Sequence, residues 1–151
     1  MKVSKNGIKL IKEFEGCRLK AYYDAVGVLT IGYGTTNADK DITGINITSN
    51  MIITQKVADN WLELTLNKKY CKKIDKYQKK YKFNQNQYDA LVSFAYNIGS
   101  IDQLTGNGTR TKKEISDKML LYDKAGGKTL PGLTRRRKAE HKLYNTKVVK
   151  K

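Results

Sequence analysis

Strand-forming sequence is confined to one stretch of this 151-residue chain, residues 20–36. Tyrosine and β-branched residues are frequent there, and Asp24-Ala25-Val26-Gly27 divides the stretch as a turn. Before residue 16 and beyond residue 54, apolar residues instead recur at helical spacing. The order of a helix, a small sheet and then helices alone predicts an α+β fold with segregated elements, not alternating βαβ units. The length predicts a single domain over residues 1–151.

Five helices are predicted from the apolar spacing and from the capping residues. The first covers residues 4–15, with Ser4 or Asn6 as its N-cap and Gly16 as its stop. Polar composition predicts a loop or a short third strand over residues 37–50, and a loop over 100–110. The other four helices are expected at about 54–80, 87–98, 111–124 and 133–144. The second half of the helix at 54–80 is basic and is either a separate helix or a solvated extension.

The chain is strongly basic. It carries 30 lysine and arginine residues against 14 aspartate and glutamate residues, a formal net charge of +16. A charge of this size predicts a polyanionic partner, which is a nucleic acid, an anionic membrane surface or an acidic cell-wall polymer. Basic runs at 68–82 and 135–142 are either solvated helix faces or the surfaces that attract such a partner.

Several classes of site and of protein are excluded by composition. One histidine, His141, rules out a multi-histidine metal site, and two cysteines rule out a disulfide scaffold or a four-sulfur zinc site. No apolar stretch approaches a membrane span, and no secretory signal is recognisable. We therefore expect no metal or cofactor, a location in a cytoplasm unless something releases the protein, and reduced thiols at Cys17 and Cys71.

Glu15 is the first candidate for chemistry. On a helical wheel it falls between Ile8 and Ile11, on an apolar flank of the first helix. A carboxyl in such a place loses solvation and holds a proton near neutrality, as a general acid must. The alternative is a residue at the end of a helix that is turned out to water ahead of Gly16.

Asp24 and Thr30 are the other two candidates. At the hairpin turn, Asp24 is either a turn residue with local hydrogen bonds or an ionised carboxylate that acts as a base. Thr30 is either an ordinary strand threonine or a hydroxyl that shares one strand face with Gly32 and Gly34. Such a face would form a flat floor that suits a sugar ring. Paired carboxyls of unlike proton affinity on either side of a cleft are typical of glycosidases.

Three separated stretches resemble the phage lysozymes (endolysins) of glycoside hydrolase family 24. The first runs from Phe14-Glu15-Gly16 through Thr30 to Gly32-Tyr33-Gly34, the second from Gln85 to Gly99, and the third from Gly132 to Glu140. They stand in the order of that family, and the resemblance covers roughly residues 7–145.

The resemblance implies a lysozyme-like fold of two lobes. The small lobe would cover about residues 15–53 with the hairpin. The large lobe would combine the N-terminal helix with about residues 66–145, and the long helix near 54–80 would join the two. It also implies an N-acetylmuramidase that cuts the β-1,4 bond between N-acetylmuramic acid and N-acetylglucosamine in peptidoglycan. Glu15 would then be the general acid, while Asp24 would orient or deprotonate the attacking water and Thr30 would hold it, in an inverting single displacement.

The resemblance assigns further residues to the cleft. Tyr96 and Asn97 would line it, beside the floor expected at Gly32 and Gly34. One of Arg135 or Arg136 would pair with Glu15, which opposes the effect of desolvation on that carboxyl.

The chain departs from the family at Thr35, where many relatives have a histidine, and at Thr65, where they have its aspartate partner. We predict that Thr35 and Thr65 meet, directly or through water. Since that pair is structural in the relatives, its loss leaves the catalytic assignment intact.

Three other functions compete with hydrolysis. A lytic transglycosylase would need the acid but no base that activates water, so Asp24 and Thr30 favour hydrolysis. The charge alone suggests a nucleic-acid-binding module or a membrane-disrupting cationic protein, but no nucleic-acid-binding motif is present and helix 133–144 has few apolar residues. We expect the glycan strand and the anionic cell envelope as partners and no nucleic acid. We also expect a monomer that reaches the wall through a separate pore-forming protein.

Overall fold

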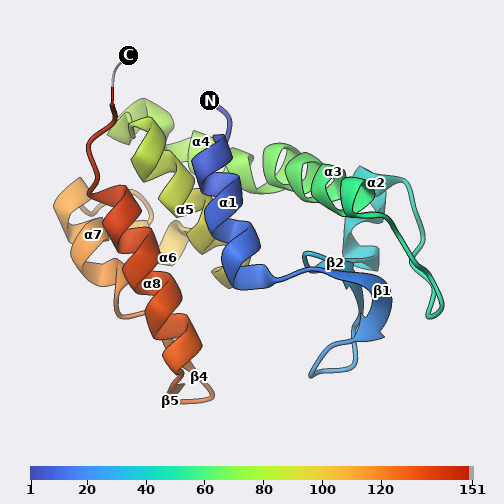
Figure 1. Ribbon diagram of the computed structural model, residues 1–151. Helices are drawn as coiled ribbons and strands as arrows, with labels where there is room; N and C mark the ends of the chain where they lie inside the picture. Colours follow the sequence, from blue (N-terminus) through green and yellow to red (C-terminus); the bar gives the residue numbers. More distant parts are fainter. Residues whose placement is uncertain (150–151) are drawn as a thin grey trace.

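The computed structural model describes residues 1–149 and confirms the predicted α+β fold. In chain order the elements are α1 (Lys5–Glu15), β1 (Arg18–Tyr23), β2 (Leu29–Gly32), β3 (Thr35–Thr36), η1 (Asn37–Asp39), α2 (Lys40–Thr43), α3 (Gln55–Thr65), η2 (Leu66–Tyr70), α4 (Cys71–Tyr81), α5 (Gln85–Ile98), α6 (Asp102–Thr105), α7 (Lys112–Met119), β4 (Lys124–Ala125), β5 (Lys128–Thr129) and α8 (Pro131–Tyr144). Figure 1 shows β1 and β2 on one side of the molecule and most helices on the other, with α3 and α4 running between them.

The sheet β1-β2-β3 is antiparallel and has a small hydrophobic core of its own. Tyr22 pairs with Thr30 across β1 and β2, and Ile31 pairs with Thr35 across β2 and β3. The core residues of this cluster are Ala21, Ile31, Ile47 and Trp61, the last of which comes from α3. The helix α3 is therefore the support on which the hairpin rests.

Residues 37–50 contain a helix that polar composition did not predict. The third strand is Thr35–Thr36, within the predicted hairpin, and the chain then enters a 3₁₀ turn and α2. Thr36 Oγ1 accepts a hydrogen bond from the Ala38 N–H (3.2 Å), and Asp39 accepts one from the Thr36 N–H (3.0 Å). This reciprocal cap starts helical structure in a segment with little apolar sequence.

The predicted helix over 54–80 is present as a single helical rod from Gln55 to Tyr81. Thr54 caps it, since its side chain accepts from the Val57 N–H (3.2 Å). Its middle, Leu66–Tyr70, is a π-helical turn, which the apolar spacing did not predict. The basic second half is a continuation of the rod and not a separate helix.

The large hydrophobic core is built around α5. Its middle residues, including Tyr88, Leu91, Val92 and Phe94, are fully buried. Asn84 starts this helix through a reciprocal cap with Gln87, and Gly99, at a φ of 112°, ends it. Among the described residues, no helix has both the length and the apolar character that crossing a membrane requires.

The remaining differences from prediction lie after α5. The short helix α6 occupies part of the predicted loop 100–110, and α7 ends at Met119 and not near residue 124. The Gly126-Gly127 pair turns a small hairpin between β4 and β5. The last helix begins at Pro131, two residues before the predicted Leu133, because proline is favourable in the first helical turn.

Gly7 of α1 packs directly on Asp89 of α5. A methyl group on Gly7 would lie 2.6 Å from Val3 Cγ2 and 2.8 Å from Asp89 Cβ. We therefore expect Gly7→Ala to lower the free energy of unfolding by about 1–3 kcal/mol, as overpacked sites do. Urea denaturation measures this change. Because alanine otherwise favours a helix, a stabilised variant would contradict the close packing of α1 on α5.

Candidate active site

Glu15 is the last residue of α1 and stands at the junction with the sheet. The helix ends there because Gly16 takes a φ of 66°, and its N–H returns to the Lys12 carbonyl (3.1 Å) as the chain turns into β1. The Glu15 side chain is 22% exposed and accepts a hydrogen bond from Arg136 Nη1. Glu15 is therefore a partly buried carboxyl in a charge-assisted contact, and is not turned freely out to water.

Of the two candidate arginines, Arg136 is the one that lies against Glu15. Its side chain is 4% exposed, its Nη2 donates to the Ser93 carbonyl (3.1 Å), and its Nε donates to Glu140 Oε2 (3.2 Å). Arg135 is exposed and lines the space beside this pair. The guanidinium of Arg136 thus joins α1, α5 and α8 at one point.

Behind Arg136 lies a buried ionic cluster that the sequence analysis missed. Arg137 and Glu140 are fully buried, with the Arg137 Nε 2.8 Å from Glu140 Oε1. Burial lowers the pKa of Arg137 and raises that of Glu140, and the two guanidinium groups oppose the rise at Glu140.

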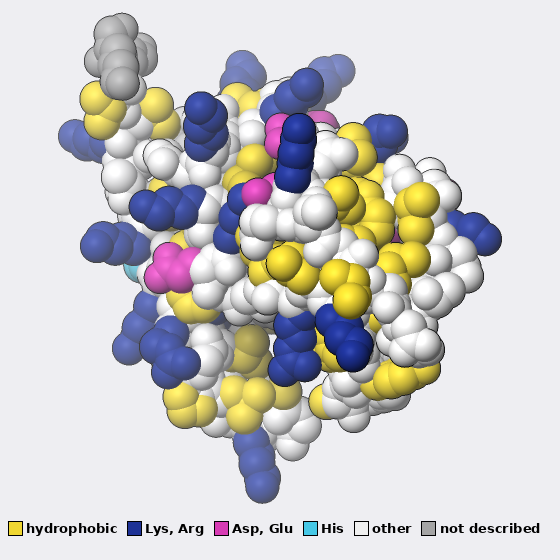
Figure 2. Space-filling view, turned by 45° about the vertical axis from the view of Figure 1, so that its right-hand side comes forward, with side chains coloured by type: hydrophobic (Ala, Val, Ile, Leu, Met, Phe, Trp, Pro, Cys, Tyr) yellow, Lys and Arg dark blue, Asp and Glu magenta, His cyan; other side chains and the backbone are white. Residues whose placement is uncertain are grey.

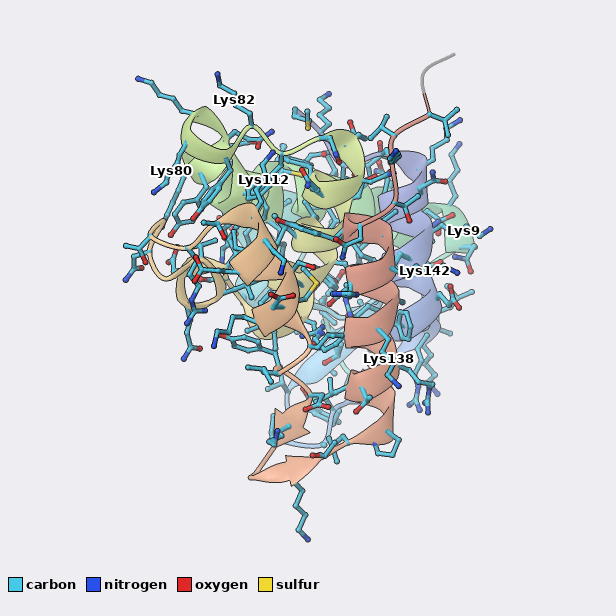
Figure 3. The ribbon with its side chains drawn as sticks, turned by 90° about the vertical axis from the view of Figure 1, so that its left-hand side faces the viewer. Lys9, Lys80, Lys82, Lys112, Lys138 and Lys142 are labelled. Carbon is cyan, nitrogen blue, oxygen red and sulfur yellow. The ribbon has the colours of Figure 1, made fainter. Side chains whose placement is uncertain are left out.

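The interpretation of 135–142 as a solvated basic face is therefore wrong for three of its residues, Arg136, Arg137 and Glu140. Glu140 stands four residues after Arg136 and three after Arg137, and Tyr144 follows one helical turn later. That spacing is the signal that could have placed them on one buried face. Figure 3 shows Lys138 and Lys142 of the same helix pointing outward instead.

Asp24 forms the turn that the sequence indicated. Its Oδ1 accepts hydrogen bonds from the Val26 N–H (2.9 Å) and the Val28 N–H (2.8 Å). Both bonds use one oxygen, and they fix the carboxylate at the tip of the β1-β2 hairpin. Asp24 is therefore a structural residue of the hairpin, whatever chemistry it also performs.

Thr30 lies on β2, where its side chain is buried and its hydroxyl donates to the Val28 carbonyl (2.8 Å). That bond links it to the same turn residue that Asp24 holds. The donor of this hydroxyl is occupied, while its oxygen remains able to accept a hydrogen bond.

The common floor expected at Gly32 and Gly34 is not formed. A Cβ on Gly32 would lie at ordinary contact distance from Ala58 Cβ (3.5 Å) and Ile53 Cδ1 (3.6 Å), so this position faces α3. A Cβ on Gly34 would instead lie 3.5 Å from the Tyr96 hydroxyl and 3.9 Å from Glu15 Oε1. Both glycines have positive φ, which breaks the alternation of strand faces on which the prediction relied.

Tyr96 supports the loop that lies beside Glu15. Its hydroxyl donates to the Tyr33 carbonyl (2.7 Å), and its ring meets Tyr70 edge-on at 4.9 Å between centroids. Burial first, and the neighbouring Glu15 carboxylate second, raise the pKa of Tyr96 far above its ordinary value. Tyr96 therefore stays protonated and keeps the Tyr33-Gly34 loop against Glu15.

A cavity of about 620 Å³ opens between the end of α1 and the start of α8. Asn97 lies on its wall, and the Asn97 Oδ1 accepts a hydrogen bond from Arg137 Nη2 (2.9 Å). The volume falls in the range that accommodates small organic ligands. The lining residues are Glu13, Phe14, Glu15, Asn97, Leu130, Gly132, Leu133, Arg135 and Arg136.

The structure shows no direct hydrogen bond between Thr35 and Thr65, and a contact through water stays a prediction. Both side chains are buried, but Thr65 Oγ1 has no hydrogen-bond partner among the described residues.

The cysteines and the possible metal ligands of the sequence form neither a disulfide nor a metal site among the described residues. Cys71 is buried, Cys17 is half-buried, and the two are not bonded to each other. In the described part of the chain, no group of histidine, cysteine and acidic side chains has the arrangement of a metal site.

Comparisons with known proteins relate nearly the whole chain to one family. The phage lysozyme family model matches residues 12–140. The endolysin of Lactococcus phage c2 is 43% identical over 150 residues, covering 98% of this chain and 62% of that protein. This chain therefore spans about three-fifths of the length of that relative. The endolysin of Salmonella phage P22 is 35% identical over 150 residues, covering 95% of this chain and 98% of that protein.

Two solved structures share the fold. An endolysin from Escherichia coli O157:H7 phage FAHEc1 superposes with a TM-score of 0.80 at 34% identity, covering 100% of this chain and 98% of that chain. The muramidase domain of SpmX from Asticaccaulis excentricus gives a TM-score of 0.79 at 30% identity, covering 97% of this chain and 99% of that chain.

Proposed function

The chain belongs to the phage lysozyme family, and on that basis we propose that it is an endolysin with muramidase activity. The substrate is peptidoglycan, and the bond cleaved is the β-1,4 bond between N-acetylmuramic acid and N-acetylglucosamine. The observation that carries this proposal is the partly buried Glu15, which contacts Arg136 at the edge of a cavity between the end of α1 and the start of α8.

The proposed reaction is a single displacement. Glu15 donates its proton to the glycosidic oxygen as the bond to the anomeric carbon breaks. Asp24 orients a water molecule or takes its proton, the Thr30 oxygen holds that water, and the water oxygen bonds to the anomeric carbon with inversion. This mechanism requires about 6.5–9.5 Å between the two carboxyls, room enough for the water.

The remaining predicted residues have distinct roles in this proposal. Gly34 lets the sugar approach Glu15 closely, because any side chain there would project toward that carboxyl. Tyr96 holds the Gly34 loop, and Asn97 offers its amide nitrogen to the glycan while Arg137 holds its oxygen. Gly32 contributes packing on α3 and no contact to the sugar.

Product analysis tests the reaction. Digestion of purified peptidoglycan by the wild-type protein is expected to release muropeptides with reducing ends. A lytic transglycosylase would instead release 1,6-anhydro sugars, because the muramic acid hydroxyl replaces water as the nucleophile. Mass spectrometry separates the two products, and anhydro ends as the main product would overturn the hydrolytic mechanism.

The positive charge of the surface supports a second part of the proposal, attraction to the anionic cell envelope. Figure 2 shows lysine and arginine side chains spread over the visible face, with few acidic residues among them. Figure 3 shows Lys9 on α1 and Lys138 and Lys142 on α8 pointing away from the molecule. Exposed charges of this kind act at a distance and are screened by salt.

Salt is therefore expected to weaken the binding of the protein to cell walls. Sedimentation of an inactive Glu15→Gln variant with purified walls should show at least about tenfold weaker binding when NaCl rises from about 50 to about 300 mM. Binding to an uncharged chitin oligosaccharide is the control and should change little. Wall binding that is insensitive to salt would contradict electrostatic attraction.

We also propose that the protein acts as a monomer, and that a separate pore-forming protein releases it from the host cytoplasm to the wall. The support is the name endolysin, which its relatives carry. Expression with and without a pore-forming protein tests this, and lysis in both cases would contradict it.

A further inference from the structure

Glu140 is a fully buried carboxyl that contacts both Arg136 and Arg137. Its Oε2 accepts hydrogen bonds from the Ser93 hydroxyl (2.6 Å) and from Arg136 Nε and Arg137 Nη2 (both 3.2 Å). Its Oε1 lies 2.8 Å from Arg137 Nε. One carboxyl therefore contacts both arginines that lead to the cavity.

The two arginines contact different residues of the site. Arg136 reaches Glu15 through Nη1, while Arg137 reaches Asn97 through Nη2 and lies over the Phe94 ring at 4.7 Å. Arginine remains charged at every accessible pH, so the cluster holds two permanent positive charges away from water. A buried charge without a partner is strongly destabilising, and Glu140 is the buried acid that compensates both.

We propose that Glu140 is a positioning residue of the active site, which fixes Arg136 against Glu15 and Arg137 against Asn97 and balances their charges. This inference rests on the proposed function, because it assigns Glu15 the role of acid. Glu140 touches neither the cavity nor the substrate, so it acts only through the two arginines.

The charge balance determines how readily Glu15 holds its proton. Arg136 contacts Glu15, the charged residues Glu13 and Arg135 line the same cavity, and the tyrosines Tyr96 and Tyr70 lie nearby. The groups that face Glu140 are Arg136, Arg137 and Ser93, and Asp123 acts on Arg137 from beyond. With Glu140 neutral, both arginines would act on Glu15, and the acid would release its proton at lower pH. If a neutral residue replaced Arg137, the charge of Glu140 would offset that of Arg136 more fully, and Glu15 would hold its proton to higher pH.

Glu140→Gln and Arg137→Gln are therefore expected to shift the titration of Glu15 in opposite directions. Carbon-13 NMR on protein with labelled glutamate should show the titration midpoint of Glu15 lower by about one pH unit in Glu140→Gln. The same midpoint should be higher in Arg137→Gln. Because Arg136 is no longer held against Glu15 once Glu140 is replaced, kcat of Glu140→Gln should fall about tenfold with little change in KM.

Asp89→Asn is the matched control. Asp89 is also a fully buried carboxylate on α5, and it accepts hydrogen bonds from the Ser4 N–H (2.9 Å) and Gln85 Nε2 (2.8 Å). Asp89 contacts the start of α1 through Ser4, whereas Glu15 is the last residue of α1. Asp89→Asn should lower the melting temperature and leave the Glu15 titration and kcat unchanged.

The outcomes separate positioning from mere structure. Opposite shifts in the two variants, with none in Asp89→Asn, support the role of Glu140. A folded Glu140→Gln protein whose Glu15 midpoint and kcat match the wild type overturns it. If Glu140→Gln does not fold, the upward shift in Arg137→Gln decides in favour, and its absence decides against. The NMR titration needs no substrate, so an inactive wild-type protein would refute the proposed function without removing this test.

Discussion

Replacement of Glu15 by glutamine is expected to lower kcat on peptidoglycan by a factor of about 10²–10⁴, the usual contribution of a general acid. Glutamine keeps the shape of the side chain and can still accept a hydrogen bond from Arg136, but it carries no transferable proton. The loss should therefore appear in kcat, with KM largely unchanged. Release of reducing ends from purified peptidoglycan measures it.

Glu13→Gln provides the matched control for this experiment. Glu13 is exposed and lines the same cavity two residues earlier, so its substitution removes the same charge from the same surface. We expect Glu13→Gln to retain nearly full activity. Equal release of reducing ends by Glu15→Gln and the wild type would show that Glu15 is not the general acid.

Replacement of Asp24 by asparagine is expected to reduce kcat by about 10²–10⁴-fold as well, because the amide cannot take a proton from water. The substitution is informative because Asp24 also forms the hairpin turn. Asparagine retains Oδ1, which accepts from the Val26 and Val28 N–H groups, so the turn should remain. Thermal melting of the variant should accordingly stay close to that of the wild type.

Asp24→Ala separates the two roles of this residue. Alanine removes both the base and the turn acceptor, so this variant should lose activity and also melt at lower temperature. If Asp24→Asn remains fully active while Asp24→Ala loses activity, Asp24 is a turn residue alone and the water must be activated by another group.

The helices with strong apolar spacing and capping residues were predictable from the sequence. The first helix and α5 lie within one or two residues of their predicted bounds, since Gly16 and Gly99 end them. The elements that were missed are short. Helices α2 and α6 have four residues each and depend on caps and local hydrogen bonds, not on an apolar face.

The active site was predictable where local sequence determines it and not where distant segments meet. The places of Glu15 at a helix end and of Asp24 in a turn follow from local sequence, while their catalytic roles stay predictions. The choice between Arg135 and Arg136 depends on how α8 is rotated against α5, which a single sequence does not specify. Glu140 was missed because charged residues in a basic run are usually solvated, and only its spacing from the arginines indicated otherwise.

The π-helical turn at Leu66–Tyr70 changes how far α4 is rotated about the helix axis relative to α3. Before this turn, Trp61 packs into the small cluster beside the sheet and Leu62 into the large one, and after it Ile74 and Tyr77 also pack into the large one. A π turn holds about one residue more than an α-helical turn. Deleting one residue there would rotate everything downstream by roughly 100° about the rod axis and turn Ile74 and Tyr77 away from their core. One surplus residue thus sets the phase of α4, so that its apolar side meets the same large core as Leu62 of α3.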